Sequence, residues 1–555
     1  MTRSIPRLVT ALSALVVAQA AAAQTARFDR FSYDGRSQER VVVVPNAYRN
    51  PILSGYYPDP SVTRVGDDYY LVNSSFAHFP GLPIFHSKDL VSWVQIGNAI
   101  SRPSQLDFTG RAVSQGVFAP DISWHAGVFY IVNTCVECKG NFVITAKDPA
   151  GPWSDPIWLP FEGIDPSLYW EGDKAYIVNN RAPNEPPRYD GHRAIWVQEY
   201  DWRAGKMVGP STQIVNGGVD LATKPVWIEG PHLIKHDGFY HLIAAEGGTG
   251  DNHSEVVFRS KSLTGPFAPY VGNPILTQRG LAADRSNPVT SAGHAKFVQT
   301  QNGDWWATFL ATRPYAPERY AIGRETFLLP VTWSNGWPHI LAPKTPIPFA
   351  APKPNLPVQP RPTTPVTGDF GYSDTFRGKS LAMQWIGIRT PATPFYTLGT
   401  GGLTLHSRAA LGDRQGVPAF LGRRQQHHVA TIMTRVTFVP GTDGARAGLA
   451  AVQNDESFLF FGLTRIAGKS VVALYARDKA QSDTLVAAAP VDLSGPVTLT
   501  IRADAGEMTF DYQTRAGRRT LKSKFDANLL TTARAGGFVG TIVGPYVYDP
   551  AAGTR

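Results

Sequence analysis

The first 340 residues repeat one pattern of polar and apolar positions five times. In each repeat an acidic or imidazole side chain leads a short apolar stretch, a polar turn with a glycine follows, and a strand pattern rich in aromatic residues comes next. Successive turn glycines are 45 to 66 residues apart, which is a suitable length for one blade of a β-propeller. The turn glycines are Gly66, Gly127, Gly172, Gly238 and Gly303. The repeat therefore predicts a five-bladed β-propeller over residues 45–342.

The residues that lead the five repeats carry acid or imidazole groups. They are Asp59, Asp121, Asp165, Glu229 and His294. Blades of a propeller surround one central channel, so five equivalent strand starts meet at one mouth. Acidic groups are costly to hold together, and such clusters are commonly functional. The pattern therefore predicts an acid-lined pocket.

The pattern changes after the fifth repeat. Residues 343–367 are dense in proline, which removes backbone donors and favours an extended, stiff linker. Beyond it, residues 430–438 and 497–502 alternate apolar and polar side chains, and turns rich in Gly, Asp and Pro separate such stretches. This is typical of an antiparallel sandwich. We expect an all-β chain: a five-bladed β-propeller followed by a C-terminal β-sandwich over residues 368–555.

Composition supports this fold class and adds a targeting segment. Aromatic residues make up 11% of the 555 positions, and the 52 glycines and 45 prolines suit short strands joined by tight turns. At the N-terminus, Arg3 and Arg7 precede a short apolar stretch that ends in small residues. Residues 1–23 are therefore predicted to be a signal peptide, and the protein to be exported to the periplasm or the extracellular space. No later stretch predicts a membrane span.

The net charge and the cysteine content indicate which ligands and partners are disfavoured. The formal net charge of +9 comes from scattered Lys and Arg residues, which favours solubility over nucleic-acid binding. Cys135 and Cys138 are the two cysteines, and without a second pair they do not predict structural zinc. A short-loop disulfide and two partly buried thiols are both consistent with this spacing.

The acidic constellation has a chemical use. Hydrolysis of a glycosidic bond needs a proton donor on one side of the anomeric carbon and a carboxylate on the other. Glu229 is the candidate acid and Asp59 the candidate partner, while Asp165 is placed to raise the acid's pKa. Each acid alone is better explained as a turn former, because Asp caps such turns without doing chemistry. Four acids at matched positions favour function, with Asp121 structural.

For the remaining candidate site residues, the residue types and positions alone give weaker support. His294 could orient a substrate hydroxyl, hold a water or ligate a cation. Arg313 and Arg324 lie beside the last blade, where solvated surface is the default expectation for each. Phe76 and Phe118 could form apolar walls against a sugar face, although core packing explains them equally well.

At these residues the chain resembles glycoside hydrolase family 43, in its branch of two-domain β-xylosidases and α-L-arabinofuranosidases. The segment Tyr57-Pro-Asp-Pro-Ser61 carries the resemblance, as do further motifs throughout both predicted domains. These motifs occupy residues 79–90, 119–121, 163–167, 229–232, 245–249, 293–295, 323–325, 336–338, 422–427, 447–450 and 537–540.

The resemblance implies a role for each candidate. Asp59 matches the general base, Asp165 the residue that modulates the acid's pKa, and Glu229 the general acid of an inverting hydrolase. For substrate binding, the matching residues are Phe76, Phe118, His294 and Arg324. Phe118 stands where the family often has tryptophan. The short stretch between Arg313 and Arg324 favours the branch that includes arabinofuranosidases.

The predicted function is therefore exo-hydrolysis, with inversion, that releases β-D-xylose or α-L-arabinofuranose from xylan- or arabinoxylan-derived oligosaccharides. The alternative is a non-catalytic carbohydrate-binding propeller. A retaining propeller glycosidase is disfavoured because Pro58, and not Asn, precedes Asp59. The chemistry requires no cofactor and no catalytic metal. A structural calcium ion, the preferred pentose and the oligomeric state are left open.

Overall fold

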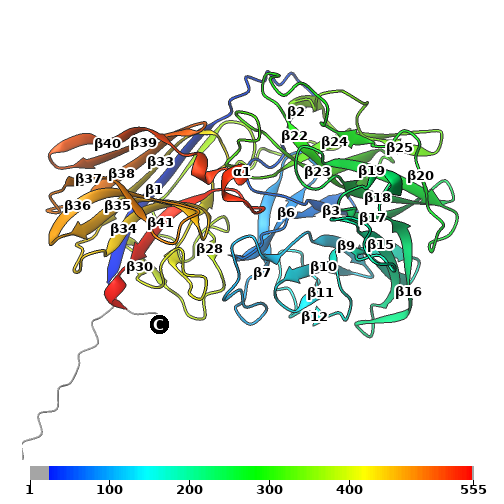
Figure 1. Cartoon of the computed structure of the whole chain (residues 1–555), viewed down its shortest axis with the longest axis horizontal. Helices are drawn as coiled ribbons and strands as arrows, with labels where there is room; N and C mark the ends of the chain where they lie inside the picture. Colours follow the sequence, from blue (N-terminus) through cyan, green and yellow to red (C-terminus); the bar gives the residue numbers. More distant parts are fainter. Residues whose placement is uncertain (1–23, 553–555) are drawn as a thin grey trace, which may run out of the picture.

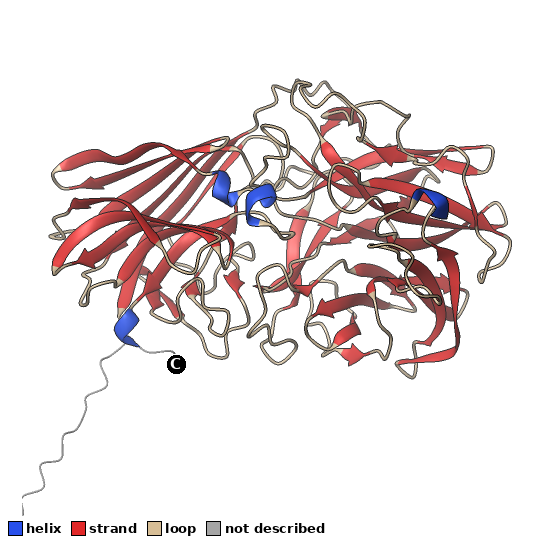
Figure 2. Cartoon of the chain, viewed as in Figure 1, coloured by secondary structure: helices blue, strands red, loops and turns tan. Residues whose placement is uncertain are grey.

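The computed structural model describes residues 24–552, and the predicted signal peptide, residues 1–23, lies outside this range. Two bodies built almost wholly of strands lie side by side (Figures 1 and 2). The few helical turns are η1 (Leu221–Thr223), η2 (Asn528–Leu530), α1 (Thr532–Ala535) and η3 (Pro550–Ala552). None of the helices within residues 24–552 is long and apolar enough to cross a membrane.

The larger body is a propeller of five antiparallel sheets, which confirms the predicted fold class. Blades one and two consist of β3 (Ser61–Val65), β4 (Asp68–Val72), β6 (Gly81–Ser87) and β7 (Val94–Ile100), then β8 (Gly116–Val117), β9 (Asp121–His125), β10 (Val128–Val136), β11 (Gly140–Ala146) and β12 (Ile157–Trp158). Blade three consists of β13 (Ile164–Glu171), β14 (Lys174–Arg181), β15 (Ala194–Asp201) and β16 (Lys206–Asn216). Blades four and five consist of β17 (Glu229–His236), β18 (Phe239–Glu246), β19 (Ser254–Ser260), β20 (Ala268–Pro269) and β21 (Leu276–Thr277), then β22 (Thr290–Gln299), β23 (Trp305–Thr312), β24 (Glu325–Ser334) and β25 (Trp337–His339).

Apolar side chains hold neighbouring blades together. Five buried clusters lie between successive blades, including one between the fifth and the first. Ile52 and Leu53, upstream of the first blade, bond to Thr326 in β24, so the start of the propeller is tied to its last blade. The ring is therefore closed, and the five inner strands are held around one axis.

The second body is a sandwich of two antiparallel sheets around one large core. The first sheet contains β29 (Tyr396–Gly399), β30 (Gly402–His406), β1 (Thr25–Arg36), β33 (Val429–Thr437), β38 (Val497–Asp504), β39 (Glu507–Thr514) and β40 (Gly517–Asp526), with β27 (Phe370–Asp374) also paired to β1. The second contains β31 (Ala419–Phe420), β41 (Ile542–Tyr548), β34 (Arg446–Asn454), β35 (Ser457–Ile466), β36 (Lys469–Asp478) and β37 (Thr484–Pro490), with β32 (Arg423–Arg424) paired to β41.

Strand β1 is an addition to the predicted sandwich. The predicted domains do not include residues 24–44, yet β1 pairs with β27, β30 and β33 inside the first sheet (Figure 1). Phe28, Phe31 and Tyr33 point into the sandwich core, and the intervening polar residues face outward. A lone strand that precedes a repeat has no pattern of its own to assign it to a distant sheet.

The proline-rich segment packs against the propeller. Within it, β26 (Ala350–Pro352) pairs with β2 (Ala47–Arg49), so part of the predicted linker joins a two-stranded sheet.

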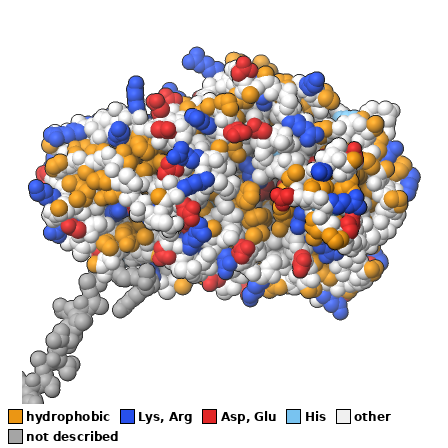
Figure 3. Space-filling model, in the orientation of Figure 1, with side chains coloured by type: hydrophobic (Ala, Val, Ile, Leu, Met, Phe, Trp, Pro, Cys, Tyr) orange, Lys and Arg blue, Asp and Glu red, His pale blue; other side chains and the backbone are white. Residues whose placement is uncertain are grey.

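Cys135 and Cys138, for which the sequence allowed either a disulfide or two free thiols, form a disulfide. On the face of the molecule in Figure 3, basic and acidic side chains are interspersed.

The two bodies share an interface that combines a buried apolar cluster with buried polar contacts. A short sheet joins β5 (His78–Phe79) of the propeller side to β28 (Gly387–Ile388). Directly after β28, the fully buried Arg389 ion-pairs with Asp455 and donates to the Arg111 carbonyl at 2.8 Å. Arg313, for which solvated surface was the default expectation, is also buried and bonds Glu39 and Glu325. That default is wrong for Arg313.

Removal of the Arg389 guanidinium should destabilise the protein strongly. Arg389→Ala leaves the Asp455 carboxylate buried without its main partner, and losing one member of a buried pair costs about 3–5 kcal/mol. We expect a clear fall in the midpoint of chemical denaturation. The double variant Arg389→Ala/Asp455→Ala should recover part of the loss. A single variant as stable as the wild type would contradict this assignment.

Candidate active site

The structure brings all seven predicted site residues to one cavity of about 450 Å³ at the mouth of the propeller. These residues are Asp59, Phe76, Phe118, Asp165, Glu229, His294 and Arg324. Four of the five residues that lead the repeats are therefore among the lining residues, as expected from their matched positions. Arg324, for which surface was the default from the residues alone, is buried here, as the family resemblance implied.

Irregular backbone at the strand starts directs these side chains. Asp59, Asp165 and His294 have φ of 51°, 52° and 56°, a left-handed conformation that is uncommon for residues other than glycine. The strand pairing also shifts just after Asp165, after Glu229 and on both sides of Gly293, where bulges interrupt the ladder. Such conformations cost energy and cluster at functional sites. The side chains of this group are therefore oriented by a strained backbone.

Gly230 follows Glu229 and allows the close approach of blade five. Its φ is 54°, and a Cβ atom there would lie 2.6 Å from His294 Nε2. Any larger residue would displace the imidazole. The Glu229-Gly motif is therefore explained by the packing of His294 against the backbone.

Asp59 is held in a buried polar network. Arg324 donates through Nη1 to Oδ1 at 2.8 Å, and the Ser74 hydroxyl donates to Oδ2 at 2.5 Å. The His294 Nδ1 lies 3.8 Å from Oδ1. Arg324 and Ser74 together fix the orientation of this carboxyl group in the pocket, and a general base must be held in position in this way.

The two other carboxyl groups have raised pKa values. Burial raises the pKa of Asp165 to about 6, and His294 opposes this rise while Asp59 adds to it. Burial also raises the pKa of Glu229 well above its usual range, and the charges of Asp165 and Asp59 raise it further. Glu229 therefore keeps its proton to higher pH than an ordinary glutamate, as a general acid requires.

A fourth carboxyl group supports His294 from behind. Glu255 in β19 is fully buried, and its Oε2 accepts from the Ala295 amide at 2.9 Å. The His294 amide also bonds to this carboxyl group. Glu255 thus holds the left-handed turn that points the imidazole at Asp59. The sequence pattern does not identify Glu255, because a single acid within a strand carries no positional signal.

Aromatic side chains from both bodies form one wall of the cavity. The ring of Phe76 lies 5.1 Å from that of Phe118 and 5.9 Å from that of Phe538. Phe538 comes from the sandwich, in the loop that follows α1 at the junction of the two bodies (Figure 1). The Phe538 carbonyl also accepts from Arg324 at 3.5 Å. The sandwich therefore completes the pocket.

Arg193 and Trp227 line the same cavity as Glu229. The Arg193 guanidinium lies over the Trp227 ring, 4.9 Å from its centre, and Arg193 Nε donates to Asn180 Oδ1 at 2.7 Å. The positive charge of Arg193 opposes the rise in the pKa of Glu229. Neither residue repeats with the blades, so the pattern could not identify them; the position of Trp227 two residues before Glu229 was the one available signal.

Asp121 is not among the cavity-lining residues, in line with the structural role expected for it. Its carboxylate accepts from the Ser61 hydroxyl at 2.8 Å, the Leu168 amide at 2.9 Å and Lys296 Nζ at 2.7 Å. It therefore ties blade two to blades one, three and five. Across residues 24–552, no group of three or more His, Cys, Asp or Glu side chains could hold a metal ion.

The fold and the site together define a class of protein. A pocket with one carboxyl group held in an ion pair and another whose pKa is raised matches what hydrolysis of a glycosidic bond requires. The chain belongs to glycosyl hydrolases family 43, whose model matches residues 48–338. Residues 373–555 match the β-xylosidase C-terminal concanavalin A-like domain. The protein is thus a two-domain glycosidase, and the family resemblance found in the sequence is confirmed.

Similar proteins cover nearly the whole chain. A xylosidase/arabinosidase of Butyrivibrio fibrisolvens is 39% identical, over 90% of this chain and 95% of its own length. A non-reducing end α-L-arabinofuranosidase of Bacteroides ovatus, BoGH43B, is 35% identical, over 91% of this chain and 92% of its own. The crystal structure of a GH43_12 protein from a capybara gut metagenome superposes with a TM-score of 0.89 at 38% identity, covering 95% of this chain and all of that one.

Loss of the Phe538 ring should weaken catalysis without unfolding the protein. The ring is 37% exposed and contacts Phe76 and Phe118 along the cavity wall. Aromatic pairs contribute about 0.5–1.5 kcal/mol each. For Phe538→Ala we expect kcat/KM to fall roughly 5- to 30-fold, which corresponds to about 1–2 kcal/mol. Phe538→Leu should retain part of the activity, and an unchanged kcat/KM in Phe538→Ala would show that the wall is not used.

Proposed function

We propose that this protein releases a terminal pentose, β-D-xylose or α-L-arabinofuranose, from xylan- or arabinoxylan-derived oligosaccharides by a single displacement with inversion. The observation that carries the proposal is the presence, in one pocket, of an Arg324-bound Asp59 and a Glu229 whose pKa is raised. The names of the similar proteins from Butyrivibrio fibrisolvens and Bacteroides ovatus support the choice of pentose.

The proposed step needs only groups of this chain and one water. The water oxygen attacks the anomeric carbon, and Asp59 accepts a proton from this water. The bond from that carbon to the glycosidic oxygen breaks, and Glu229 gives its proton to the departing oxygen. Asp165 raises the pKa of Glu229 so that the proton is present at the start. Asp59 ends protonated and Glu229 ionised, and exchange with solvent resets both groups.

The remaining lining residues fit the recognition of a single terminal sugar. Phe76, Phe118 and Phe538 offer apolar faces, while Arg324 and His294 offer polar groups beside Asp59. A cavity of about 450 Å³ that is walled on one side by a loop from the sandwich suits a chain end better than the middle of a polymer. We also propose export of the protein to the periplasm or the extracellular space, on the basis of residues 1–23.

The test is release of p-nitrophenol from the β-D-xyloside and the α-L-arabinofuranoside, with the product anomer followed by NMR. Activity on either substrate identifies the preferred pentose. Immediate appearance of the anomer opposite to that of the substrate supports inversion. A product that retains the substrate's configuration would overturn the single displacement, and no release of pentose from either substrate or from xylo-oligosaccharides would overturn the proposed function.

The charge at position 193 should set the alkaline limit of activity. Glu229 works as an acid only while protonated, so activity falls as the pH rises through its pKa. Arg193 favours the ionised carboxylate, and its removal should therefore raise this pKa. We expect the alkaline limb of the kcat/KM profile to move to higher pH in Arg193→Met. Arg193→Lys, which retains the charge, should leave the limb in place; a limb that does not move in Arg193→Met would show that Arg193 does not act on the acid.

A further inference from the structure

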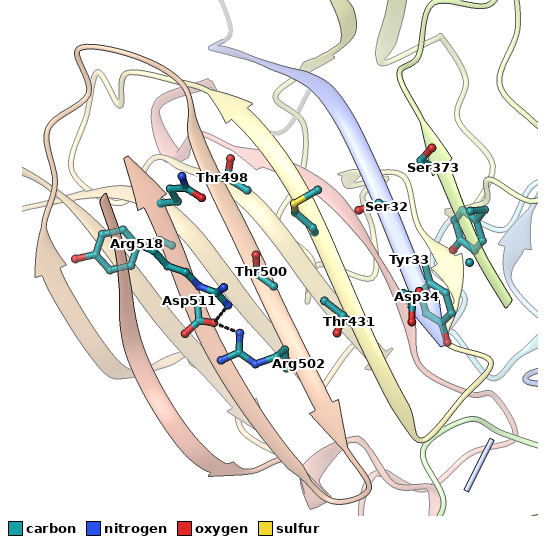
Figure 4. Close-up of a pocket in the computed structure, with 15 residues that line it drawn as sticks. Ser32, Tyr33, Asp34, Ser373, Thr431, Thr498, Thr500, Arg502, Asp511 and Arg518 are labelled. Carbon is teal, nitrogen blue, oxygen red and sulfur yellow. Dashed lines mark hydrogen bonds and ion pairs between the residues drawn. The ribbon is translucent and has the colours of Figure 1, made fainter. Parts of the chain in front are cut away.

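A second, larger cavity lies on the sandwich. It measures about 770 Å³ and occupies the outward face of the first sheet, across β27, β1, β33, β38 and β39 (Figure 4). We call it the sheet groove and define it by Ser32, Ser373, Met433, Thr500, Arg502 and Asp511. The sandwich core lies on the opposite face of this sheet, so the groove serves no packing role within the protein.

Strand register aligns the groove residues in one row. Ser373 pairs with Ser32, Ser32 with Met433, Met433 with Thr500, and Thr500 with Asp511. Asp511 in turn pairs with Thr520 of β40. Neighbouring strands lie about 4.8 Å apart, so six strands carry a row about 24 Å long, which spans several sugar rings. Because most of these side chains are short, the middle of the row forms a floor between longer residues.

One end of the row is built rigidly around a buried carboxylate. Asp511 is only 2% exposed and accepts from Arg518 at 2.6 Å, from Thr520 Oγ1 at 2.7 Å and from Arg502 (Figure 4). The two guanidinium groups are themselves partly exposed. Each has more N–H groups than it uses on Asp511, so fixed donors remain for a ligand.

The chemistry of the lining selects a neutral, hydroxyl-rich occupant. Two acids, Asp34 and Asp511, balance two bases, Arg502 and Arg518, although the chain as a whole carries +9. No lysine or glutamate is found among the described lining residues, which is unusual for an exposed sheet face. Hydroxyl, guanidinium, carboxylate and amide groups together donate to and accept from sugar hydroxyls.

We propose that the sheet groove binds an internal segment of a neutral polysaccharide chain, while the propeller pocket receives chain ends. The choice of a xylan-type glycan rests on the proposed function, whereas the groove itself does not. The groove then tethers the enzyme to the polymer and raises the local concentration of ends at the pocket.

The experiment measures retardation of the protein in native gels that contain soluble neutral arabinoxylan. The Glu229→Gln background prevents digestion of the polymer. Thr500→Lys raises the groove floor and Arg502→Ala removes a donor, and both side chains face outward on the sheet. Thr437→Lys, on the same face of β33 but outside the lining residues, is the matched control. We expect retardation to be at least about tenfold weaker in the two groove variants, as for loss of one well-placed contact. The control variant should be retarded as strongly as the parent protein.

Three results would overturn the proposal: no retardation of the parent protein, equal retardation of parent and groove variants, or stronger retardation by anionic polygalacturonate, which would assign an anion site instead. With the catalytic Glu229 restored, Thr500→Lys should hydrolyse aryl glycosides like the wild type. Failure of aryl-glycoside and oligosaccharide hydrolysis in the wild type overturns the proposed function alone, because binding in the groove is measured without turnover.

Discussion

Replacement of Glu229 by Gln is expected to lower kcat/KM on xylo- and arabinoxylo-oligosaccharides by about 10³- to 10⁴-fold, at the upper end of what general acid catalysis contributes. A sugar alkoxide is a poor leaving group and needs a proton in the transition state. A p-nitrophenolate group leaves without one, so the loss on aryl glycosides should be much smaller. The ratio of the two losses, and not their size, identifies an acid.

The comparison needs a folded protein with an intact pocket. Glutamine has nearly the shape of glutamate, and the ion pairs found within residues 24–552, such as Arg324–Asp59 in this pocket, do not include Glu229. We therefore expect an unchanged Tm and retained affinity for the oligosaccharide, measured by calorimetry. Equal losses on both substrate types would instead assign Glu229 to binding or to nucleophilic attack.

The part of the site that repeats with the blades could be predicted from the sequence. Asp59, Asp165, Glu229 and His294 hold equivalent positions at the starts of four inner strands, and a closed ring of blades brings equivalent positions together. Asp121 holds the same position in the repeat, yet its carboxylate is fully used in ties between blades. Position in the repeat therefore predicts proximity to the axis, and hydrogen bonding decides the role.

The part of the site that comes from elsewhere could not be predicted in this way. Phe538 reaches the cavity from the sandwich, nearly 200 residues after the last blade, because the interface around Arg389 and Arg313 fixes the two bodies against each other. Strand β1 joins the sandwich for a similar reason. Local patterns of polar and apolar residues predict strands, but contacts between distant segments follow from packing that no local pattern encodes.

Removal of the Asp59 carboxylate should have an effect of similar size but a different signature. Asp59→Asn cannot accept the proton of the attacking water, and we expect kcat/KM to fall by about 10²- to 10⁴-fold. Activation of water is needed whatever the leaving group is. The loss should therefore be nearly equal on aryl glycosides and on oligosaccharides, in contrast to that of Glu229→Gln.

Asp121→Asn is the matched control for this prediction, because Asp121 leads blade two as Asp59 leads blade one. It leaves Lys296 with its charge in a buried network and should cost about 3–5 kcal/mol of stability, as for a broken buried pair. Its kcat at a temperature where it is folded should remain near that of the wild type. Asp59→Asn also leaves a buried cation, Arg324, without its carboxylate and should lose stability too, but its kcat should stay lost at a temperature where it is folded. If both variants lose stability and neither loses kcat selectively, Asp59 is a second structural tie and the base must be sought elsewhere in the pocket.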